Sequence, residues 1–480
     1  MTAAISPAAL RGMLEGGGEL ALVDVREELI YSQGHLLLAR SAPLSRLELT
    51  FAVLVPRRTT RIVLCDGNDD LAGHAAAVLA RNGYSDLRIL AGGVAAAAGF
   101  ELFTGVNVPS KAFGEYIEHE DGTPSIAADE LARLIGKDAD LVVLDSRPFD
   151  EYARVSIPGA INVPGAELVL RAREIAPSPD TMVVVNCAGR TRSIIGAQSL
   201  INAGLPNKVA ALRNGTMGWS LAGLTCDRGK SRRAPRVSHE QLGWAKSAAR
   251  RVAQACGVES IDRARLDALR RDQSRTLYVF DVRDPAEYLA GHIAGAISAP
   301  GGQLVQATDQ YIGTLGARVV LVDDLEVRAA MTGSWLRQMG FGDVFLLAEA
   351  GDENGCPATP VLENETKPET AIEAEVLADL VSRNAATVLD LSLSRNFLAG
   401  HIPGAWFAIR RRLKRALEKI AIETTLVLTS EDGTLAALAV GEAETLVDRR
   451  VRFLQGGNAA WQAAGQPFSC LLYTSDAADE

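Results

Sequence analysis

One motif occurs four times along this chain of 480 residues, and the repetition limits the folds that the chain can adopt. Each copy is an apolar run that ends in Asp, followed some ten residues later by a Gly-His or Ile-Pro-Gly turn. The four copies begin at Asp24, Asp145, Asp281 and Asp390. Three have a histidine in the turn (His35, His292 and His401), and the second has Ser156 instead. Four copies of one unit predict four similar domains.

A second apolar run follows each copy and leads into an Ala-rich helical pattern. These runs are Arg61–Leu64, Met182–Asn186, Val319–Val322 and Leu426–Thr429. Strands that alternate with helices predict an α/β unit with a parallel sheet. We therefore expect the α/β class: four tandem domains, each a central parallel β-sheet flanked by helices.

The expected domains cover residues 1–104, 123–226, 257–351 and 369–469. The segments between them read as an irregular stretch at 104–122, a short basic one at 227–236 and a polar one at 352–370, and a helix over 239–256 precedes the third domain. Residues 470–480 resemble a sequencing adapter translated in frame, so we leave them out of the fold. We therefore expect the fourth domain to be truncated near Ser469 and to lack its final helix.

Composition narrows the possible functions and the compartment. The net charge of -10 argues against a nucleic-acid binder, and no apolar run is long enough for a membrane span. The first residues lack the basic and apolar regions of a signal peptide. Six cysteines are scattered without a CxxC pair, which fits a reducing cytoplasm better than disulfides or a zinc site. We expect a cytoplasmic protein with no bound metal.

The strongest candidate site follows the second run, where the apolar residues stop at Cys187. The residues after this cysteine are Ala188, Gly189, Arg190, Thr191 and Arg192. A thiol in a short loop that opens a helix faces backbone N–H groups and the positive end of the helix dipole, which favour a thiolate and hold anions. The two arginines add permanent positive charge. The segment predicts a nucleophilic thiolate that reacts with a small anion.

The combined pattern is DVRxxxEYxxGHIxGAxxxP, then a strand-Cys-loop-helix segment, then GGxxxW. It resembles the rhodanese family of sulfurtransferases, present here as four tandem domains. The resemblance implies that Cys187 takes the outer sulfur of thiosulfate or another sulfane donor as a persulfide, and that residues 188–192 bind this small sulfur-containing anion. It further implies a thiol or cyanide as acceptor, a protein as a possible acceptor, and no cofactor.

The other three domains depart from this pattern at the cysteine. Alignment of the repeats predicts Cys65, Asp323 and Ser430 at the position of Cys187. Asp323 and Ser430 cannot form a persulfide, so we expect the third and fourth domains to be inactive. The loop after Cys65 contains three carboxylates and looks one residue longer. Because these carboxylates raise the pKa of a thiol and repel a dianion, Cys65 is at most a secondary thiol.

Other residues of the motif have structural interpretations. We expect the three motif histidines to hydrogen-bond turns within their own domains, and Asp145 and Arg147 to form a structural pair. Cys226 reads as a linker cysteine, with a role in resolving a persulfide as the alternative.

Two other functions compete with sulfur transfer. Three imperfect loops suit a docking or scaffold protein with little catalysis. A phosphatase or arsenate reductase would use a related loop, but the phosphatases of this fold have a C-x5-R loop. The spacing from Cys187 to Arg192 is C-x4-R, the sulfurtransferase length.

Overall fold

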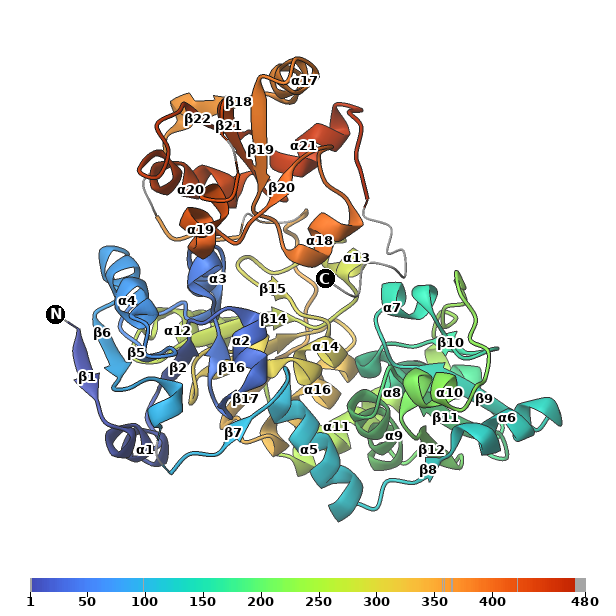
Figure 1. Cartoon of the computed structure of the whole chain (residues 1–480). Coiled ribbons are helices and arrows are strands. Elements are labelled where there is room, and N and C mark those ends of the chain that lie inside the picture. Colours follow the sequence, from blue (N-terminus) through green and yellow to red (C-terminus); the bar gives the residue numbers. More distant parts are fainter. Residues whose placement is uncertain are drawn as a thin grey trace. The chain divides into compact units, whose positions relative to one another are not determined.

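Four parallel sheets of five strands, one for each repeat, form the framework of the chain (Figure 1). The computed structural model describes residues 2–97, 99–355, 357, 359–363, 366–420 and 422–470. The strand orders are β1-β6-β5-β2-β4, β8-β12-β11-β9-β10, β13-β17-β16-β14-β15 and β18-β22-β21-β19-β20. The two motif strands of each repeat lie side by side within the sheet and are largely buried, as expected of parallel strands covered by helices on both faces. The predicted fold class is confirmed.

Domain 1 contains an additional two-stranded antiparallel ribbon, β3-β7. Its strands are β1 (Ala3–Ile5), β2 (Ala21–Asp24), β3 (His35–Leu36), β4 (Arg40–Ser41), β5 (Arg61–Cys65), β6 (Asp86–Leu90) and β7 (Leu102–Phe103). Its helices are α1 (Pro7–Glu15), α2 (Glu28–Gln33), η1 (Leu44–Arg46), α3 (Leu47–Leu54), α4 (Leu71–Arg81) and η2 (Val94–Ala96).

Domain 2 contains the candidate cysteine loop between β11 and α9. Its strands are β8 (Ser125–Ile126), β9 (Leu141–Asp145), β10 (Ile161–Asn162), β11 (Met182–Asn186) and β12 (Val209–Leu212). Its helices are α6 (Ala128–Gly136), α7 (Phe149–Arg154), η3 (Gly165–Glu167), α8 (Leu168–Ile175), α9 (Thr191–Asn202) and α10 (Gly215–Leu221). The expected helix over 239–256 is α11 (His239–Ala255).

Domain 3 repeats this plan and ends at its last strand. Its strands are β13 (Glu259–Ile261), β14 (Leu277–Asp281), β15 (Ile297–Ser298), β16 (Arg318–Val322) and β17 (Asp343–Leu347). Its helices are α12 (Arg263–Arg271), α13 (Pro285–Ala290), α14 (Gly301–Gln306), α15 (Thr308–Tyr311) and α16 (Val327–Gln338).

Domain 4 has the elements of domain 2 in the same order, preceded by one additional short helix. Its strands are β18 (Ala371–Ile372), β19 (Ala386–Asp390), β20 (Trp406–Phe407), β21 (Thr425–Thr429) and β22 (Val451–Leu454). Its helices are η4 (Pro368–Thr370), α17 (Ala374–Ser382), α18 (Ser394–Ala399), η5 (Arg410–Arg412), α19 (Leu413–Leu417), α20 (Thr434–Glu444) and α21 (Gly457–Ala463).

The contacts divide the chain into two compact units. One comprises residues 1–41, 53–76 and 83–359, and the other comprises 42–52, 77–82 and the chain from residue 360 onward. Within the first unit, domains 2 and 3 share one hydrophobic core that joins α8, α9 and α11 to α14 and α16. Within the second, Arg410 is buried and its guanidinium pairs with Glu48 at 3.0 Å.

Two sequence expectations about the ends of domains are wrong. The stretch 104–122 contains a helix, α5 (Val108–Glu120), whose buried face includes Ser110, Gly114 and Ile117. Domain 4 does not lack its final helix. Helix α21 occupies the place of α10, and the indole N–H of Trp461 donates to the Pro467 carbonyl at 2.7 Å, as that of Trp219 does to Thr225 at 3.0 Å. Residues 471–480 and Cys356 lie outside the described residues.

Candidate active site

Cys187 lies directly after β11, in the four-residue loop that precedes α9. Its side chain is buried, and Sγ lies 3.5 Å from the Ser193 hydroxyl oxygen. The Cys187 carbonyl accepts from the backbone N–H of Thr216 at 2.8 Å. A Cβ at Gly215, which has φ +52°, would lie 2.2 Å from that carbonyl oxygen, so only glycine permits the first turn of α10 to hold the loop.

The backbone N–H groups of residues 188–193 follow this thiol in the chain. In the part of the chain that the structure describes, none of these six groups donates a hydrogen bond to a protein atom. They belong to a tight loop and to the first turn of a twelve-residue helix. Grouped donors at a helix N-terminus bind anions, because N–H dipoles and the helix dipole both favour negative charge.

The residue of domain 1 that corresponds to Cys187 is Asp66, so the expected equivalence of Cys65 is wrong by one position. In the sheets, Asp24 pairs with Cys65 whereas Asp145 pairs with Asn186. The carbonyl of Asp66 also accepts from Val94 N–H at 2.8 Å, the counterpart of the Thr216 bond. With this register, Gly83 follows Asp66 by the same number of residues as Gly204 follows Cys187, so the segment of domain 1 is not longer than that of domain 2.

In all three of the other loops, the side chain at this position accepts from at least one N–H group whose counterpart in domain 2 has no protein acceptor among the described residues. Oδ1 of Asp66 accepts from Asn68 N–H at 2.8 Å, and Oδ2 accepts from Ala72 N–H at 2.9 Å. Asp323 accepts from the N–H groups of Leu325, Arg328 and Ala329 at 3.2, 2.7 and 3.2 Å. The hydroxyl of Ser430 accepts from Ala436 N–H at 3.3 Å. In domains 1 and 3, a carboxylate of the protein itself thus occupies the place where the loop of domain 2 could bind an anion.

Cys65 is a buried residue of the sheet. Its Sγ lies 3.4 Å from the Val23 carbonyl oxygen, and its side chain is fully buried. Burial, with a further contribution from the charge of Asp24, raises the pKa of the Cys65 thiol well above its ordinary value. The structure therefore gives Cys65 the environment of a core thiol.

The two arginines of the loop both form ion pairs. Arg192 donates from both Nη atoms to the carboxylate of Glu151, at 2.9 and 2.8 Å, and also to the Oε1 atom of Gln303 at 3.0 Å. Burial opposes ionisation of Glu151, but the hydrogen bonds and charge of Arg192 outweigh it and lower the pKa of this carboxyl group. Arg190 is half exposed and pairs with Glu118 of α5. Neither guanidinium donates to the Cys187 sulfur.

Around the loop, the motif residues form a rigid support. Asp145 accepts from Arg147 at 2.8 and 2.7 Å, and its Oδ2 atom also accepts from the Asn186 amide at 2.8 Å. This arrangement shows the structural pair expected from the sequence. The motif histidines likewise contact turns: His292 and His401 each place Nδ1 within 3.0 Å of a backbone carbonyl oxygen. Cys226 lies beside Ser220, with Sγ 3.4 Å from its hydroxyl.

Several residues of the site were not singled out from the sequence. Ser193 directly follows Arg192 in the sequence, whereas Glu151 and Gln303 come from separate segments that only the fold brings to the loop. Glu151 had a detectable signal, because Glu287 occupies the same place in the third repeat. Gln303 belongs to another domain, and no sequence pattern pointed to it.

None of the helices in the described part of the chain is long and apolar enough to cross a membrane. No group of three His, Cys, Asp or Glu side chains there is placed to hold a metal ion.

Comparison with known proteins identifies the repeat. The model of the rhodanese-like domain matches four segments, 6–98, 127–222, 263–350 and 373–464. Among solved structures, the crystal structure of a thiosulfate sulfurtransferase from Pseudomonas aeruginosa is 48% identical, with a TM-score of 0.93. The match covers 98% of this chain and 90% of that one.

Two curated proteins match this chain over about the length of one repeat. An HTH-type transcriptional regulator of Mycobacterium tuberculosis is 34% identical over 109 residues, which are 22% of this chain and 47% of that protein. A putative sulfur carrier protein of Bacillus subtilis is 26% identical over 103 residues, 22% of this chain and 54% of that protein. The chain thus spans about half the length of these curated relatives.

Proposed function

This chain belongs to the family of rhodanese-like domain proteins, and on that premise we propose that it is a sulfurtransferase with one active domain. It moves a sulfane sulfur from thiosulfate, or from a related persulfide donor, to a thiol or cyanide through a persulfide on Cys187. The similarity to the thiosulfate sulfurtransferase over nearly the whole chain supports the reaction class.

The reaction consists of two displacements at sulfur. The Cys187 thiolate attacks the outer sulfur of thiosulfate, a new S–S bond forms, and the old one breaks as sulfite leaves with its electron pair. A thiolate or cyanide then attacks the outer sulfur of the persulfide, and Cys187 leaves as the thiolate. The N–H groups of residues 188–193 stabilise the anionic sulfur between the two steps.

The observation that carries the proposal is the carboxylate in the equivalent loops of domains 1 and 3. An Asp carboxylate oxygen and the outer sulfur of a cysteine persulfide are both two bonds beyond Cβ. Asp66 and Asp323 therefore place negative charge where a Cys187 persulfide would place it. By this equivalence, the N–H groups of Gly189, Arg192 and Ser193 are the donors for the outer sulfur, as those of Leu325, Arg328 and Ala329 are for Asp323.

We propose structural roles for the other domains. Asp66, Asp323 and Ser430 each accept from N–H groups of their own segment and leave no thiol there, so domains 1, 3 and 4 do not turn over a sulfur donor. They remain available for docking a protein acceptor, the role that the scaffold alternative gives them. The C-x4-R spacing disfavours a phosphatase or arsenate reductase. The five free cysteines of the described chain are compatible with the reducing cytoplasm that we predict.

Intact-protein mass spectrometry after incubation with thiosulfate tests the proposal. The wild-type protein should gain the mass of one sulfur atom, which cyanide or a thiol then removes. Cys187→Ser should gain nothing, whereas the matched control Cys65→Ser should behave as the wild type. Absence of the adduct on the wild type would rule out thiosulfate as the donor, and survival of the adduct in Cys187→Ser would refute Cys187 as the residue that takes the sulfur.

A further inference from the structure

Domain 3 has no catalytic thiol, yet it places one side chain against the active loop of domain 2. The Oε1 atom of Gln303, on α14, accepts from Nη1 of Arg192 at 3.0 Å. Arginine has donors only, so the amide oxygen of Gln303 must face it. Arg192 is 14% exposed, and Gln303 and Glu151 approach its guanidinium from different domains.

This contact has a counterpart in the opposite direction. One constant sequence offset relates Cys187 to Asp323, Arg192 to Arg328, Glu151 to Glu287 and Glu167 to Gln303. Arg328 pairs with Glu287 of its own domain and, at 2.9 Å, with Glu167 of domain 2. The two domains thus exchange equivalent residues, as the subunits of a two-fold dimer do.

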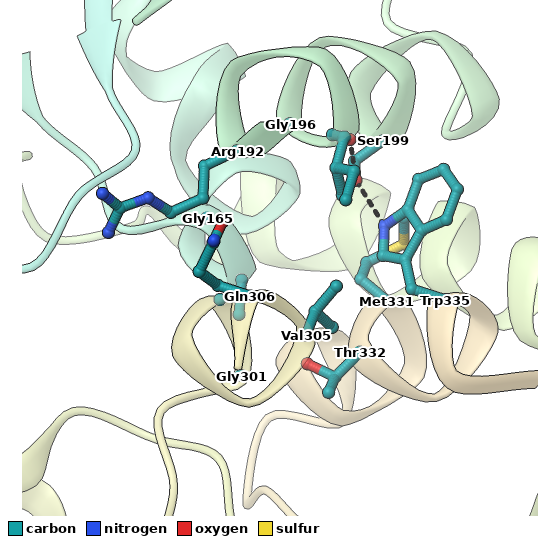
Figure 2. A pocket seen from close by; sticks show the side chains of 13 residues that line it. Gly165, Arg192, Gly196, Ser199, Gly301, Val305, Gln306, Met331, Thr332 and Trp335 are labelled. Carbon is teal, nitrogen blue, oxygen red and sulfur yellow. Dashed lines mark hydrogen bonds between the residues drawn. The ribbon is translucent and has the colours of Figure 1, made fainter. Parts of the chain in front are cut away.

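The surface between the exchanged residues is closely fitted. The indole N–H of Trp335 donates to the hydroxyl oxygen of Ser199, its counterpart by the same offset, at 2.8 Å (Figure 2). A Cβ at Gly302 would lie 3.1 Å from the Cα atom of Gly165. In Figure 2 the Arg192 side chain extends away from Trp335. This fit fixes where α14 can place Gln303.

The exchange is symmetric in position but not in charge. Arg328 forms ion pairs with four carboxylates, those of Asp323, Asp324, Glu167 and Glu287. Among the described residues, Arg192 forms an ion pair with one carboxylate, that of Glu151. Where Arg328 has Glu167, Arg192 donates a hydrogen bond to the neutral amide of Gln303. Glutamine at position 303 therefore holds the guanidinium in place without adding a second negative charge beside the active loop.

We propose that Gln303 is a positioning residue for sulfur transfer, supplied to domain 2 by domain 3, and that its neutrality sets a preference for donors with two negative charges. This inference rests on the proposed function of Cys187. Gln303 does not touch the donor. It keeps Arg192 at the loop, so that the field at the N–H groups stays favourable for a dianion.

Steady-state kinetics with two donors test this proposal. Thiosulfate has two negative charges and methanethiosulfonate has one, while both deliver the same outer sulfur. Gln303→Glu adds a negative charge near the loop. The ratio of kcat/KM for thiosulfate to kcat/KM for methanethiosulfonate should therefore fall by a factor on the order of ten. The loss should shrink as ionic strength rises. Gln303→Ala should raise KM for thiosulfate with little change in kcat.

The interface provides a matched control. Glu167 is the equivalent residue of the same surface, but it faces Arg328 in the inactive loop. Glu167→Gln should therefore leave the ratio of kcat/KM for the two donors at the wild-type value. A ratio unchanged in Gln303→Glu, or shifted equally in Glu167→Gln, would overturn the proposal. Both outcomes presuppose a wild-type protein that forms the Cys187 persulfide, so they are distinct from failure of the proposed function.

Discussion

Asp66 in domain 1 and Cys187 in domain 2 occupy the same position in the fold. Each follows a central strand, and each carbonyl accepts one backbone N–H bond at 2.8 Å from the segment that closes the domain, Val94 for one and Thr216 for the other. The carboxylate of Asp66 binds the N–H groups of its own loop, whereas the thiol of Cys187 leaves the equivalent groups without a protein acceptor. One loop is therefore filled by the protein, and the other can receive an anion.

Replacement of Cys187 by Asp should stabilise domain 2 while abolishing sulfur transfer. The new carboxylate would accept the N–H groups of Gly189, Arg192 and Ser193, as Asp323 does in its own loop. Helix-capping bonds of this kind contribute about 1 kcal/mol. Urea unfolding of Cys187→Asp, compared with Cys187→Ala, measures the difference. If the Asp variant were the less stable of the two, the equivalence between the loops would be incorrect.

The Cys65 thiol should resist alkylation over a pH range in which an exposed cysteine reacts. Its pKa is raised by burial, so the folded protein keeps the thiol protonated as pH rises past its ordinary value of 9.0. Because the unfolded chain ionises this thiol near 9.0 while the folded protein keeps it protonated, the free energy of unfolding falls progressively as pH rises from 9.0 toward the raised pKa. Iodoacetamide labelling at pH 9, followed by peptide mapping, should modify Cys65 only after denaturation. Labelling of Cys65 in the folded protein would contradict its burial.

Arg192→Ala should weaken reaction with thiosulfate more than with methanethiosulfonate. The change removes the cation at the loop and leaves the Glu151 carboxylate unpaired beside it. A lost charge interaction of this kind costs on the order of tenfold or more in kcat/KM for a dianion. The double variant Arg192→Ala/Glu151→Gln, which removes both charges, should recover part of the loss. An equal loss for both donors would show that Arg192 supports the loop only sterically.

Gly215→Ala should distort the active loop, because Gly215 contacts the backbone of Cys187. The added Cβ would lie 2.2 Å from the Cys187 carbonyl oxygen, and φ is +52°. The left-handed conformation alone costs about 1 kcal/mol, and the clash adds to it. Gly159→Ala is the matched control, since φ is +79° there and no atom lies within 4 Å of the added Cβ. Thermal unfolding and persulfide yield should fall more in Gly215→Ala, and equal losses would refute the role of this contact.

Much of this protein was determined by the sequence alone. Four repeats of apolar run, turn and helix specified four parallel α/β domains, because periodic burial is a local property that a chain shows directly. The same reading placed Met182–Asn186 on a strand and Cys187 in the loop after it. A helix within 104–122 was missed because its buried face is short, and contact with α9 stabilises it more than its own pattern does.

The tertiary structure alone decided the register of domain 1 and the surroundings of the loop. Cys65 and Asp66 are neighbours in sequence, and only strand pairing with Asp24 shows which of them faces the loop amides. A shift of one residue along a strand reverses the face of every side chain, so alignment by residue type could not settle it. Gln303 reaches Arg192 from another domain because helix packing brings distant segments together, and that information is held in the packed interface and not in any local run of residues.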